Sequence, residues 1–404
     1  MRDANFLVRE PLLDPKQRIL GYQFSWQRPD GSAAAGSEDD QDLVRHAVAG
    51  LSDADGNWLL GENLIFLQAT PAMLAEPALR ALPPHKTVLC MASQDLANAE
   101  TAAAVRELRS AGYGVSLTDA EALVHDKNLL LLVSRVEIRF GEAEFAAQAR
   151  IYGALKQSTM RMVGRGISSW KEYDSCASLG MDAFAGNLYA TQRPGTQATG
   201  LNPVQSMILQ LMDMVRKNTD VRQLEAVLKR DAALSYKLLT YINSVGFGLG
   251  TEIQSLRHAV TMLGYSPLYR WLSVLLATAG TSAQSPVLMQ TAVVRGRFVE
   301  LLGKSLLPKN EAENLFVVGM FSLLDRLLGM PMETALENIP LSEQVTEALL
   351  KRQGIYGPFL SLAEACEKGG NAAIGALADS LFISPAQVNE AHLGALTWAQ
   401  SLKL

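Results

Sequence analysis

A regular repeat in the first half of the chain is the feature that most constrains its fold. Short segments rich in apolar and β-branched residues recur there at intervals of 22 to 26 residues. They begin near Ile65, Val88, Gly114, Val136, Met160 and Ala183. Between them lie stretches with apolar residues at helical spacing, such as 96–110 and 144–157. A βα unit repeated over about 200 residues predicts a (β/α)8 TIM-like barrel, although a doubly wound sheet gives a similar pattern.

The segment before this repeat has a different pattern. Residues 6–13 and 18–26 alternate as strands do, and Asp14-Pro15 between them is typical of a turn, so we expect a pair of strands. The stretch 31–42 is small and acidic, which indicates a surface loop.

The second half has a helical pattern throughout. A polar linker at 195–203 precedes it, so we expect a barrel at 1–195 and an all-helical domain at 196–404. Helix starts are indicated by a capping residue, often with a first-turn proline or a capping box, at Asp231, Ser266-Pro267, Ser285-Pro286 and Ser384 to Gln387. The chain is therefore predicted to combine an α/β domain with an all-α domain.

Composition excludes several classes of protein. Residues 1–200 carry 19 Lys and Arg against 24 Asp and Glu, and residues 201–404 carry 17 against 17, so neither half has the basic excess of a nucleic-acid binder. Three cysteines far apart in the sequence form neither a disulfide framework nor a zinc motif. The longest apolar runs are shorter than the roughly 18 residues of a membrane span. We expect a cytoplasmic protein.

The first half resembles EAL domains, the cyclic-di-GMP phosphodiesterases. The opening FLVREPLLDPKQRILGYQFSWQ and the later segments IFLQATPAML, TVLCMASQDL, GYGVSLTDAEA, SRVEIRF and GRGISSWKEYDSCASLGMDAFAGNLYA follow that family in order. The match covers roughly residues 5–195. It implies a barrel whose chemistry lies at the carboxyl ends of the strands.

The matched positions depart from the family at its metal and nucleotide ligands. The Glu-Ala-Leu signature falls on Gln23-Phe24-Ser25, and its following arginine falls on Gln27. The other positions that the resemblance implicates are Gln68, Cys90, Thr118, Asp119, Glu137, Arg139 and the segment 164–168, which includes Arg165 and Ser168. Glu137 stands where the family has its catalytic lysine. Only Asp119 keeps the family residue, and one carboxylate does not hold two metal ions.

The second half is similar to HDOD domains, a branch of the HD phosphohydrolase superfamily without catalysis. The segment 224–276 carries the resemblance, through the run that Asp231 leads, Asn243-Ser244, and the Ala-x-x-x-Leu-Gly pattern at 259–264. Where many related domains have His-Asp, this chain has Ser322-Leu323. The resemblance therefore implies that this metal site is lost too.

Several residues have more than one interpretation. Asp119, Arg139 and Arg165 are candidates for binding an anion or a cation at the barrel mouth. The alternatives are that Asp119 caps the helix beginning at Ala120, and that the arginines neutralise nearby glutamates such as Glu137. Asn243, Ser244 and Phe247 are candidates for a partner-binding turn, or else a structural helix stop. Cys90 is expected in the barrel centre as a small apolar residue.

These observations predict a bacterial signalling protein that is not an enzyme and acts through protein contacts. Its expected partners are diguanylate cyclases or regulators, or further copies of the chain. The alternative hypothesis is a sensor that binds cyclic-di-GMP or another small anion in the barrel. We expect no cofactor, no bound metal, no nucleic acid and no membrane association.

Overall fold

The computed structural model describes most of the chain in two compact units. The described residues are 5–34, 36–140, 151–153, 155, 159–186, 188–191, 193, 201–243, 253, 255–279, 286–337, 339, 341–368 and 374–402. One unit comprises Met1–Tyr189 and Ala365–Ala376, and the other comprises Ala190–Glu364 and Leu377–Leu404. Most of the helix predicted at 144–157 and of the linker predicted at 195–203 lies outside the described residues.

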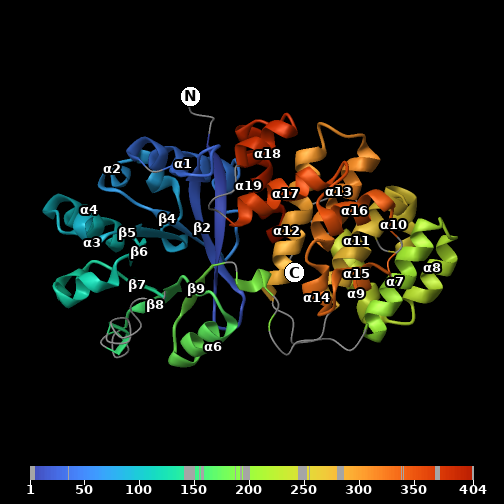
Figure 1. Cartoon of the computed structure of the whole chain (residues 1–404), viewed down its shortest axis with the longest axis horizontal. Helices are drawn as coiled ribbons and strands as arrows, with labels where there is room; N and C mark the ends of the chain where they lie inside the picture. Colours follow the sequence, from blue (N-terminus) through green and yellow to red (C-terminus); the bar gives the residue numbers. More distant parts are fainter. Residues whose placement is uncertain are drawn as a thin grey trace. The chain divides into compact units, whose positions relative to one another are not determined.

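A closed barrel of eight strands forms the centre of the first unit (Figure 1). Among the described residues the strands are β1 (Phe6–Leu13), β2 (Ile19–Gln27), β3 (Ala33–Ala34), β4 (Leu64–Gln68), β5 (Thr87–Met91), β6 (Gly114–Leu117), β7 (Arg135–Arg139), β8 (Arg161–Arg165) and β9 (Ala183–Ala185). Their order is β1-β9-β8-β7-β6-β5-β4-β2-β3, and a pairing of β1 with β2 closes the ring. The predicted strands and the barrel are confirmed.

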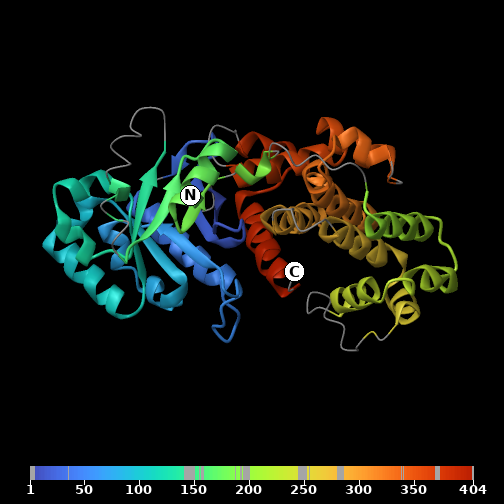
Figure 2. The ribbon, with the colours of Figure 1, turned by 90° about the horizontal axis from the view of Figure 1, so that it is seen from below.

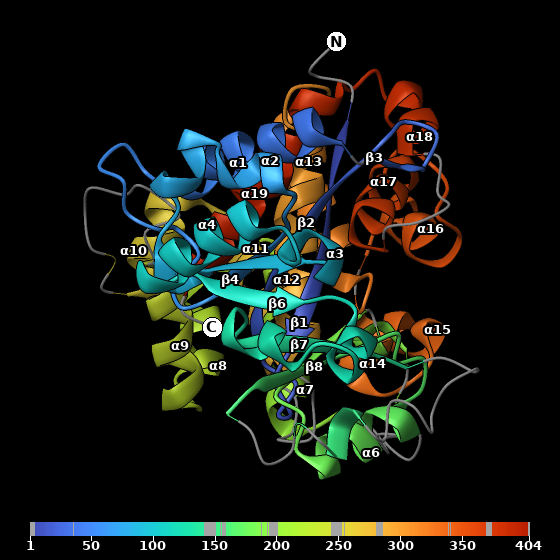
Figure 3. The ribbon, with the colours of Figure 1, turned by 90° about the vertical axis from the view of Figure 1, so that its left-hand side faces the viewer.

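The direction of one strand distinguishes this barrel from a simple βα repeat. Strands β2 and β4 to β9 pair in parallel around the ring, whereas β1 is antiparallel to both β2 and β9. The labels of β4, β6, β7 and β8 follow one another in this order in Figure 3. The short strand β3 pairs with the edge of β2 outside the ring and was not predicted.

The barrel interior is filled by side chains from successive strands. Leu12, Phe66, Val88, Cys90 and Val163 form one buried cluster with Ala183 and Ala185. Residues two apart on a strand face the same side, so the same interior rows continue to polar residues at both ends of the barrel.

Helices and short 3-10 segments connect the strands. In the described part of the first unit they are α1 (Ser37–Leu51), α2 (Pro71–Leu74), η1 (Pro77–Ala81), η2 (Pro84–Lys86), α3 (Ser93–Leu96), α4 (Ala99–Ser110), η3 (Ala120–Val124), η4 (Lys127–Leu131), α6 (Trp170–Leu179) and η5 (Leu188–Ala190). Asn98 caps α4 by accepting hydrogen bonds from two backbone N–H groups. The loop predicted at 31–42 is wrong, because its acidic residues Glu38, Asp39 and Asp40 form the first turn of α1, where the helix dipole favours negative charge.

The second unit is helical in all of its described elements (Figure 2). The helices of the second half are α7 (Pro203–Arg216), α8 (Val221–Leu228), α9 (Ala232–Ile242), α10 (Leu256–Leu263), α11 (Tyr265–Thr278), α12 (Pro286–Gly303), α13 (Lys309–Phe321), α14 (Leu324–Leu328), α15 (Met332–Glu337), α16 (Glu343–Lys351), α17 (Gly357–Lys368), α18 (Ile374–Ser380) and α19 (Pro385–Ser401). None of the described helices has both the length and the apolar character that crossing a membrane requires.

Two glycines allow the central helices α12 and α13 to pack closely. A Cβ atom at Gly319 would lie 2.7 Å from the Cα atom of Gly296 and 2.7 Å from the carbonyl oxygen of Arg295. Any larger residue at Gly319 therefore requires the two backbones to separate.

The predicted helix starts have mixed outcomes. Asp231 caps α9, and Ser384 with Gln387 forms a capping box at α19, as predicted. The start at Ser266-Pro267 is wrong, because α11 begins earlier, at Tyr265 after Gly264. Helix α12 begins at Pro286, as predicted, whereas Ser285 lies outside the described residues.

Candidate functional site

Four polar side chains meet at the carboxyl ends of the barrel strands. Glu137 of β7 is buried and is bound by the guanidinium of Arg165 on β8, through Nε to Oε2 at 2.5 Å and Nη2 to Oε1 at 3.1 Å. Arg165 also donates through Nη1 to Oε2 of Glu10 at 3.0 Å. The hydroxyl of Ser116 donates to Oε1 of Glu137 at 3.2 Å. We refer to Glu10, Ser116, Glu137 and Arg165 as the mouth network.

Charge within the mouth network is largely neutralised by its own members. Burial is the largest single effect on Arg165 and lowers its pKa, but the charge and hydrogen bond of Glu137 together with the charges of Cys90 and Glu10 exceed it, so the net pKa is raised. For Glu10, burial raises the pKa, and the nearby positive charge of Arg165 opposes that rise. Arg165 is therefore a firmly held cation between two carboxylates. Of the two interpretations of Arg165, neutralising glutamates agrees with this geometry.

Cys90 is buried in the barrel interior beside the mouth network, where it pairs in strand register with Ser116. Its side chain belongs to the interior cluster and is fully buried. Burial raises the pKa of the thiol well above its usual value, and the charge of Glu137 raises it further. This placement confirms the sequence prediction for Cys90.

Asp119 has a different role from the predicted helix cap. It precedes the segment beginning at Ala120, but its carboxylate makes no cap hydrogen bond there. Instead Oδ1 accepts the backbone N–H of Ser93 at 2.8 Å, and Oδ2 accepts the hydroxyl of Ser93. Ser93 is the first residue of α3, whose preceding residue, Ala92, has no side-chain acceptor. Asp119 therefore stabilises the start of α3 from a neighbouring loop.

The other predicted mouth residues do not join one constellation. Arg139 and Gln68 are exposed at the ends of their strands. The Thr118 hydroxyl donates to the backbone oxygen of Met91 at 3.3 Å, and the Ser168 hydroxyl donates to Glu172 at 3.0 Å. Gln23 pairs across the strands with Glu10, and its side-chain oxygen is buried with no hydrogen-bond partner in the described part of the barrel.

The mouth contains more carboxylates than the sequence indicated. Glu10 was not predicted as a site residue, because it lies on the antiparallel strand β1, and only the ring closure brings it next to Arg165. Within the described residues no group of three or more His, Cys, Asp or Glu side chains is arranged to hold a metal ion.

In the second unit, Ser322 is the residue that the resemblance places where many related domains have the histidine of a His-Asp pair. Ser322 is buried, its hydroxyl accepts from Nη1 of Arg295 at 2.7 Å, and it donates to the backbone oxygen of Gly319 at 2.6 Å. Oε1 of Glu364 lies 3.5 Å from the same nitrogen of Arg295. The same oxygen forms an ion pair with Nη2 of Arg352 at 2.9 Å. Leu323 is buried in the core. The hydrogen-bond partner of Ser322 is therefore Arg295, which in turn lies beside Glu364.

Asn243 ends α9 and fastens the chain beyond it. Its side chain donates to the backbone oxygen of Ile253 at 2.7 Å and accepts the backbone N–H of the same residue at 2.7 Å. Its φ is −86°, so its role comes from the side-chain amide and not from a left-handed backbone. Ser244 and Phe247, the other candidates for this turn, lie outside the described residues.

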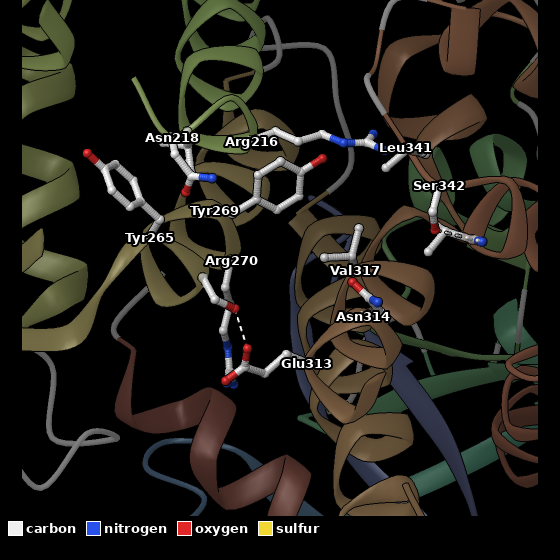
Figure 4. Close-up of a pocket in the computed structure, with 13 residues that line it drawn as sticks. Arg216, Asn218, Tyr265, Tyr269, Arg270, Glu313, Asn314, Val317, Leu341 and Ser342 are labelled. Carbon is white, nitrogen blue, oxygen red and sulfur yellow. Dashed lines mark hydrogen bonds between the residues drawn. The ribbon is translucent and has the colours of Figure 1, made fainter. Parts of the chain in front are cut away.

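Figure 4 shows a pocket of about 290 Å³ inside the second unit, among α7, α11, α13 and α16. Its labelled polar residues include Arg216, Tyr265, Tyr269, Arg270 and Glu313. The Tyr265 hydroxyl donates to the backbone oxygen of Thr219 at 2.7 Å. Burial raises the pKa of Tyr269 to about 12, so this phenol is neutral at physiological pH.

Arg270 in this pocket is held by partners within the unit. Its Nη1 lies 2.6 Å from Oε1 of Glu300, and its guanidinium lies 4.1 Å from the ring centre of Phe316 and 5.0 Å from that of Trp398. Burial lowers its pKa to about 10, and the negative charge of Glu300 opposes that lowering. Arg270 therefore stays charged and acts mainly in packing and ion pairing.

Comparison with protein-family models identifies an HDOD domain at residues 201–337. The prediction of an HDOD domain in the second half is therefore confirmed. Two curated relatives extend over nearly the whole chain. The uncharacterized protein YuxH of Bacillus subtilis is 22% identical over 98% of this chain and 98% of its own length. The cyclic di-GMP phosphodiesterase CdgJ of Vibrio cholerae is 26% identical over 90% of this chain and 85% of its own length.

Solved structures similar to the chain include proteins with EAL domains. BlrP1 of Klebsiella pneumoniae, in a complex with manganese and cyclic-di-GMP, aligns over 46% of this chain and 55% of its own, with a TM-score of 0.37 and 16% identity. An EAL domain protein of Listeria monocytogenes aligns over 46% of this chain and 87% of its own, with a TM-score of 0.35 and 16% identity.

The comparisons correct one prediction made from the sequence. We expected that the chain is not an enzyme, and this expectation is wrong, because a relative over 90% of its length is a named phosphodiesterase. The expectation rested on the substituted ligand positions alone, and Glu10, which strand β1 brings beside Arg165 together with Glu137, was not among them.

Proposed function

We propose that the chain takes part in bacterial cyclic-di-GMP signalling and transmits its signal through protein contacts made by the helical unit. The named activity of CdgJ and its similarity along most of the chain support the connection to cyclic-di-GMP. The HDOD domain supports a role in signalling.

One exposed side chain of the second unit carries the proposal of protein contacts. Phe382, between α18 and α19, is 90% exposed, and its φ is 56°. The left-handed backbone region is strained for a residue with a Cβ atom, and glycine is the usual choice at such a helix end. A large aromatic residue held there in solvent costs stability and is accounted for by contact with a partner.

Two other large apolar side chains of the same unit are also exposed to solvent. Tyr236 on α9 is 74% exposed, and Met262 on α10 is 54% exposed. Covering an aromatic or methionine side chain contributes about 1.5–3 kcal/mol to association. We propose a diguanylate cyclase or a regulator of this pathway as the partner.

The test uses the full chain with Phe382→Gly. This substitution removes the aromatic ring and suits the left-handed backbone, so the variant is expected to fold with equal or higher stability. In the source bacterium it should lose most of the effect of the wild-type chain on surface attachment driven by cyclic-di-GMP. The control must also remove an exposed apolar side chain, which rules out a buried phenylalanine such as Phe184. Leu131 of the first unit is exposed, so Leu131→Ser is the matched control.

A second candidate function is hydrolysis of cyclic-di-GMP, which the activity named for CdgJ favours. Purified wild-type chain is incubated with cyclic-di-GMP and either Mg²⁺ or Mn²⁺, and the linear product is measured. Product formation together with a fully active Phe382→Gly variant in cells would replace protein contact with hydrolysis as the main function. Loss of the cellular effect with unchanged hydrolysis would support protein contact.

A further inference from the structure

A second polar cavity lies at the opposite end of the barrel from the mouth network. It has a volume of about 380 Å³ and opens among the amino ends of β5, β6, β7 and β8. Four of its lining residues are basic or potentially basic: His85, Arg109, Arg135 and Arg161. We refer to this cavity as the basal pocket.

Arg135 is the most informative residue of the basal pocket. It is the first residue of β7, and it is only 8% exposed. Its guanidinium lies beside the Ser134 hydroxyl oxygen, 3.5 Å from Nη1, and beside the ring of Phe66, whose centre lies 5.8 Å from the guanidinium carbon. A buried guanidinium ordinarily has a carboxylate partner, because burial of an uncompensated charge is costly. Among the described residues Arg135 makes no ion pair.

Within the described residues, the neighbouring arginines Arg109 and Arg161 form no ion pair with a carboxylate either. Nη1 of Arg109 is buried without a hydrogen-bond partner in the described part of the unit. Arg161, the first residue of β8, stands beside Arg135 in the strand register. The carboxylate of Asp182 is close enough to influence Arg135, but Oδ2 accepts the backbone N–H of Met162 at 2.8 Å. Three arginines thus line one open space.

The effect of this crowding is visible in the ionisation of Arg135. Burial lowers its pKa to about 10, and the positive charge of Arg161 contributes to that lowering. Arg135 still carries its proton at physiological pH. Among the described residues, Arg135 is therefore a buried cation with no ion-pair partner, and the charge of Asp182 is its nearest compensation.

Two glycines keep the basal pocket open. A Cβ atom at Gly114 would lie 2.6 Å from Nη1 of Arg135, and one at Gly112 would lie 2.6 Å from the His85 ring. Gly112 also has a φ of +105°, a conformation that favours glycine. The absence of these two side chains leaves room for the guanidinium and for a small group beside it.

We propose that the basal pocket binds a phosphate group of a small phosphorylated molecule. Arginine suits phosphate because its planar fork donates two parallel hydrogen bonds to neighbouring oxygens. A phosphate group offers three terminal oxygens and nearly two negative charges, which matches three converging guanidinium groups better than a single carboxylate does. The volume leaves space for more of the ligand than the phosphate group.

The test is calorimetric titration of the full chain with inorganic phosphate, pyrophosphate and citrate, in chloride buffers of equal ionic strength. Pyrophosphate is expected to bind one site per chain. The variants Arg135→Met and Arg161→Gln should each weaken binding at least about tenfold, because each removes a charge-assisted hydrogen bond. Arg139→Gln, on the same strand as Arg135 but exposed at the other end, serves as the matched control and should bind as the wild type does.

Several results would overturn the proposal. They are a wild-type chain that binds neither phosphate nor pyrophosphate, a chain that binds citrate alone, and an Arg135→Met variant that folds and keeps full affinity. If Arg135→Met does not fold, Arg161→Gln decides, since this side chain is exposed and its removal leaves the barrel core unchanged. Inorganic phosphate binding as tightly as pyrophosphate would identify free phosphate itself as the ligand.

Discussion

The two ends of the barrel hold arginine in opposite ways. At the mouth, Arg165 lies between Glu137 and Glu10 and forms hydrogen bonds with both. At the base, Arg135 is equally buried but faces two further arginines and no ion-pair partner among the described residues. Both residues belong to adjacent parallel strands of one sheet. The comparison teaches that a positive residue in a barrel marks a candidate anion site only where its counter-charge is missing.

We expect the largest change in the free energy of unfolding when a negative charge is removed at the mouth. Glu137→Gln leaves the buried Arg165 with Glu10 alone, so the free energy of unfolding should fall by about 2–4 kcal/mol. Urea denaturation followed by circular dichroism measures this loss. Exposed Arg139→Gln on the same strand should change the free energy by less than about 0.5 kcal/mol. Equal effects of the two substitutions would show that the mouth ion pairs do not stabilise the barrel.

At the base, removing a buried charge should not lower the free energy of unfolding. Arg135→Met replaces an uncompensated buried cation with an apolar side chain of similar length, and we expect the free energy of unfolding to stay equal or to rise by about 1 kcal/mol. The same urea titration in phosphate-free buffer measures it. A loss of more than about 2 kcal/mol would mean that Arg135 stabilises the fold, and would remove the contrast between the two ends.

The two ends should also differ in their response to pH. Burial raises the pKa of Glu10 in the folded chain above 4.5. A raised pKa means that the folded state binds its proton more tightly, so this contribution to stability is present below pH 4.5 and is lost as pH rises through the folded pKa. Because the side chain of Glu10 is partly exposed, solvent screening keeps the effect below about 1 kcal/mol.

Thermal unfolding between pH 4 and pH 7 tests this difference. Wild-type protein should lose stability with rising pH relative to Glu10→Gln, whereas Arg135→Met should run parallel to the wild type. A pH profile of Glu10→Gln that coincides with the wild-type profile would contradict the assignment.

The last prediction concerns the reactivity of buried cysteine thiols, including the one in the barrel interior. Cys90 lies there, and Cys176 and Cys366 are also buried. Burial raises the pKa of Cys366 to about 12 and that of Cys176 to about 11. A thiol reagent at pH 8 should therefore label the native chain far more slowly than the urea-unfolded chain. Rapid labelling of native Cys90 would show that the barrel interior opens between mouth and base.

The sequence was sufficient to predict the strands of the barrel and the helical second half. Apolar segments at regular intervals predict strands because the spacing of apolar residues can be read from the local sequence. The capping residues Asp231 and Ser384 are equally local, since each acts within one turn of its helix. Of the positions that the resemblance placed at the mouth, Glu137 and Arg165 meet in the structure, and the others do not join them. The edge strand β3 escaped notice because two small residues carry no periodic signal.

The pairing of charges could not be predicted in the same way. Glu10 and Arg165 are separated by 155 positions, and only the closure of β1 onto the ring joins them. Asp119 caps a helix 26 positions earlier instead of the segment that follows it. For the basal pocket a signal was present, since Arg135 and Arg161 each open a strand, but its meaning depends on whether a carboxylate forms an ion pair with them, which the sequence does not show.

We conclude that the buried arginine at the base of the barrel is available to an anion, whereas the buried Arg165 at the mouth is already paired with carboxylates. Crystals of the full chain soaked in tungstate, a tetrahedral dianion, would reveal its position by anomalous scattering. The account predicts a peak between Arg109, Arg135 and Arg161 that disappears in Arg135→Met crystals. A peak at Arg165, or an empty basal pocket beside tungstate bound elsewhere, would contradict it.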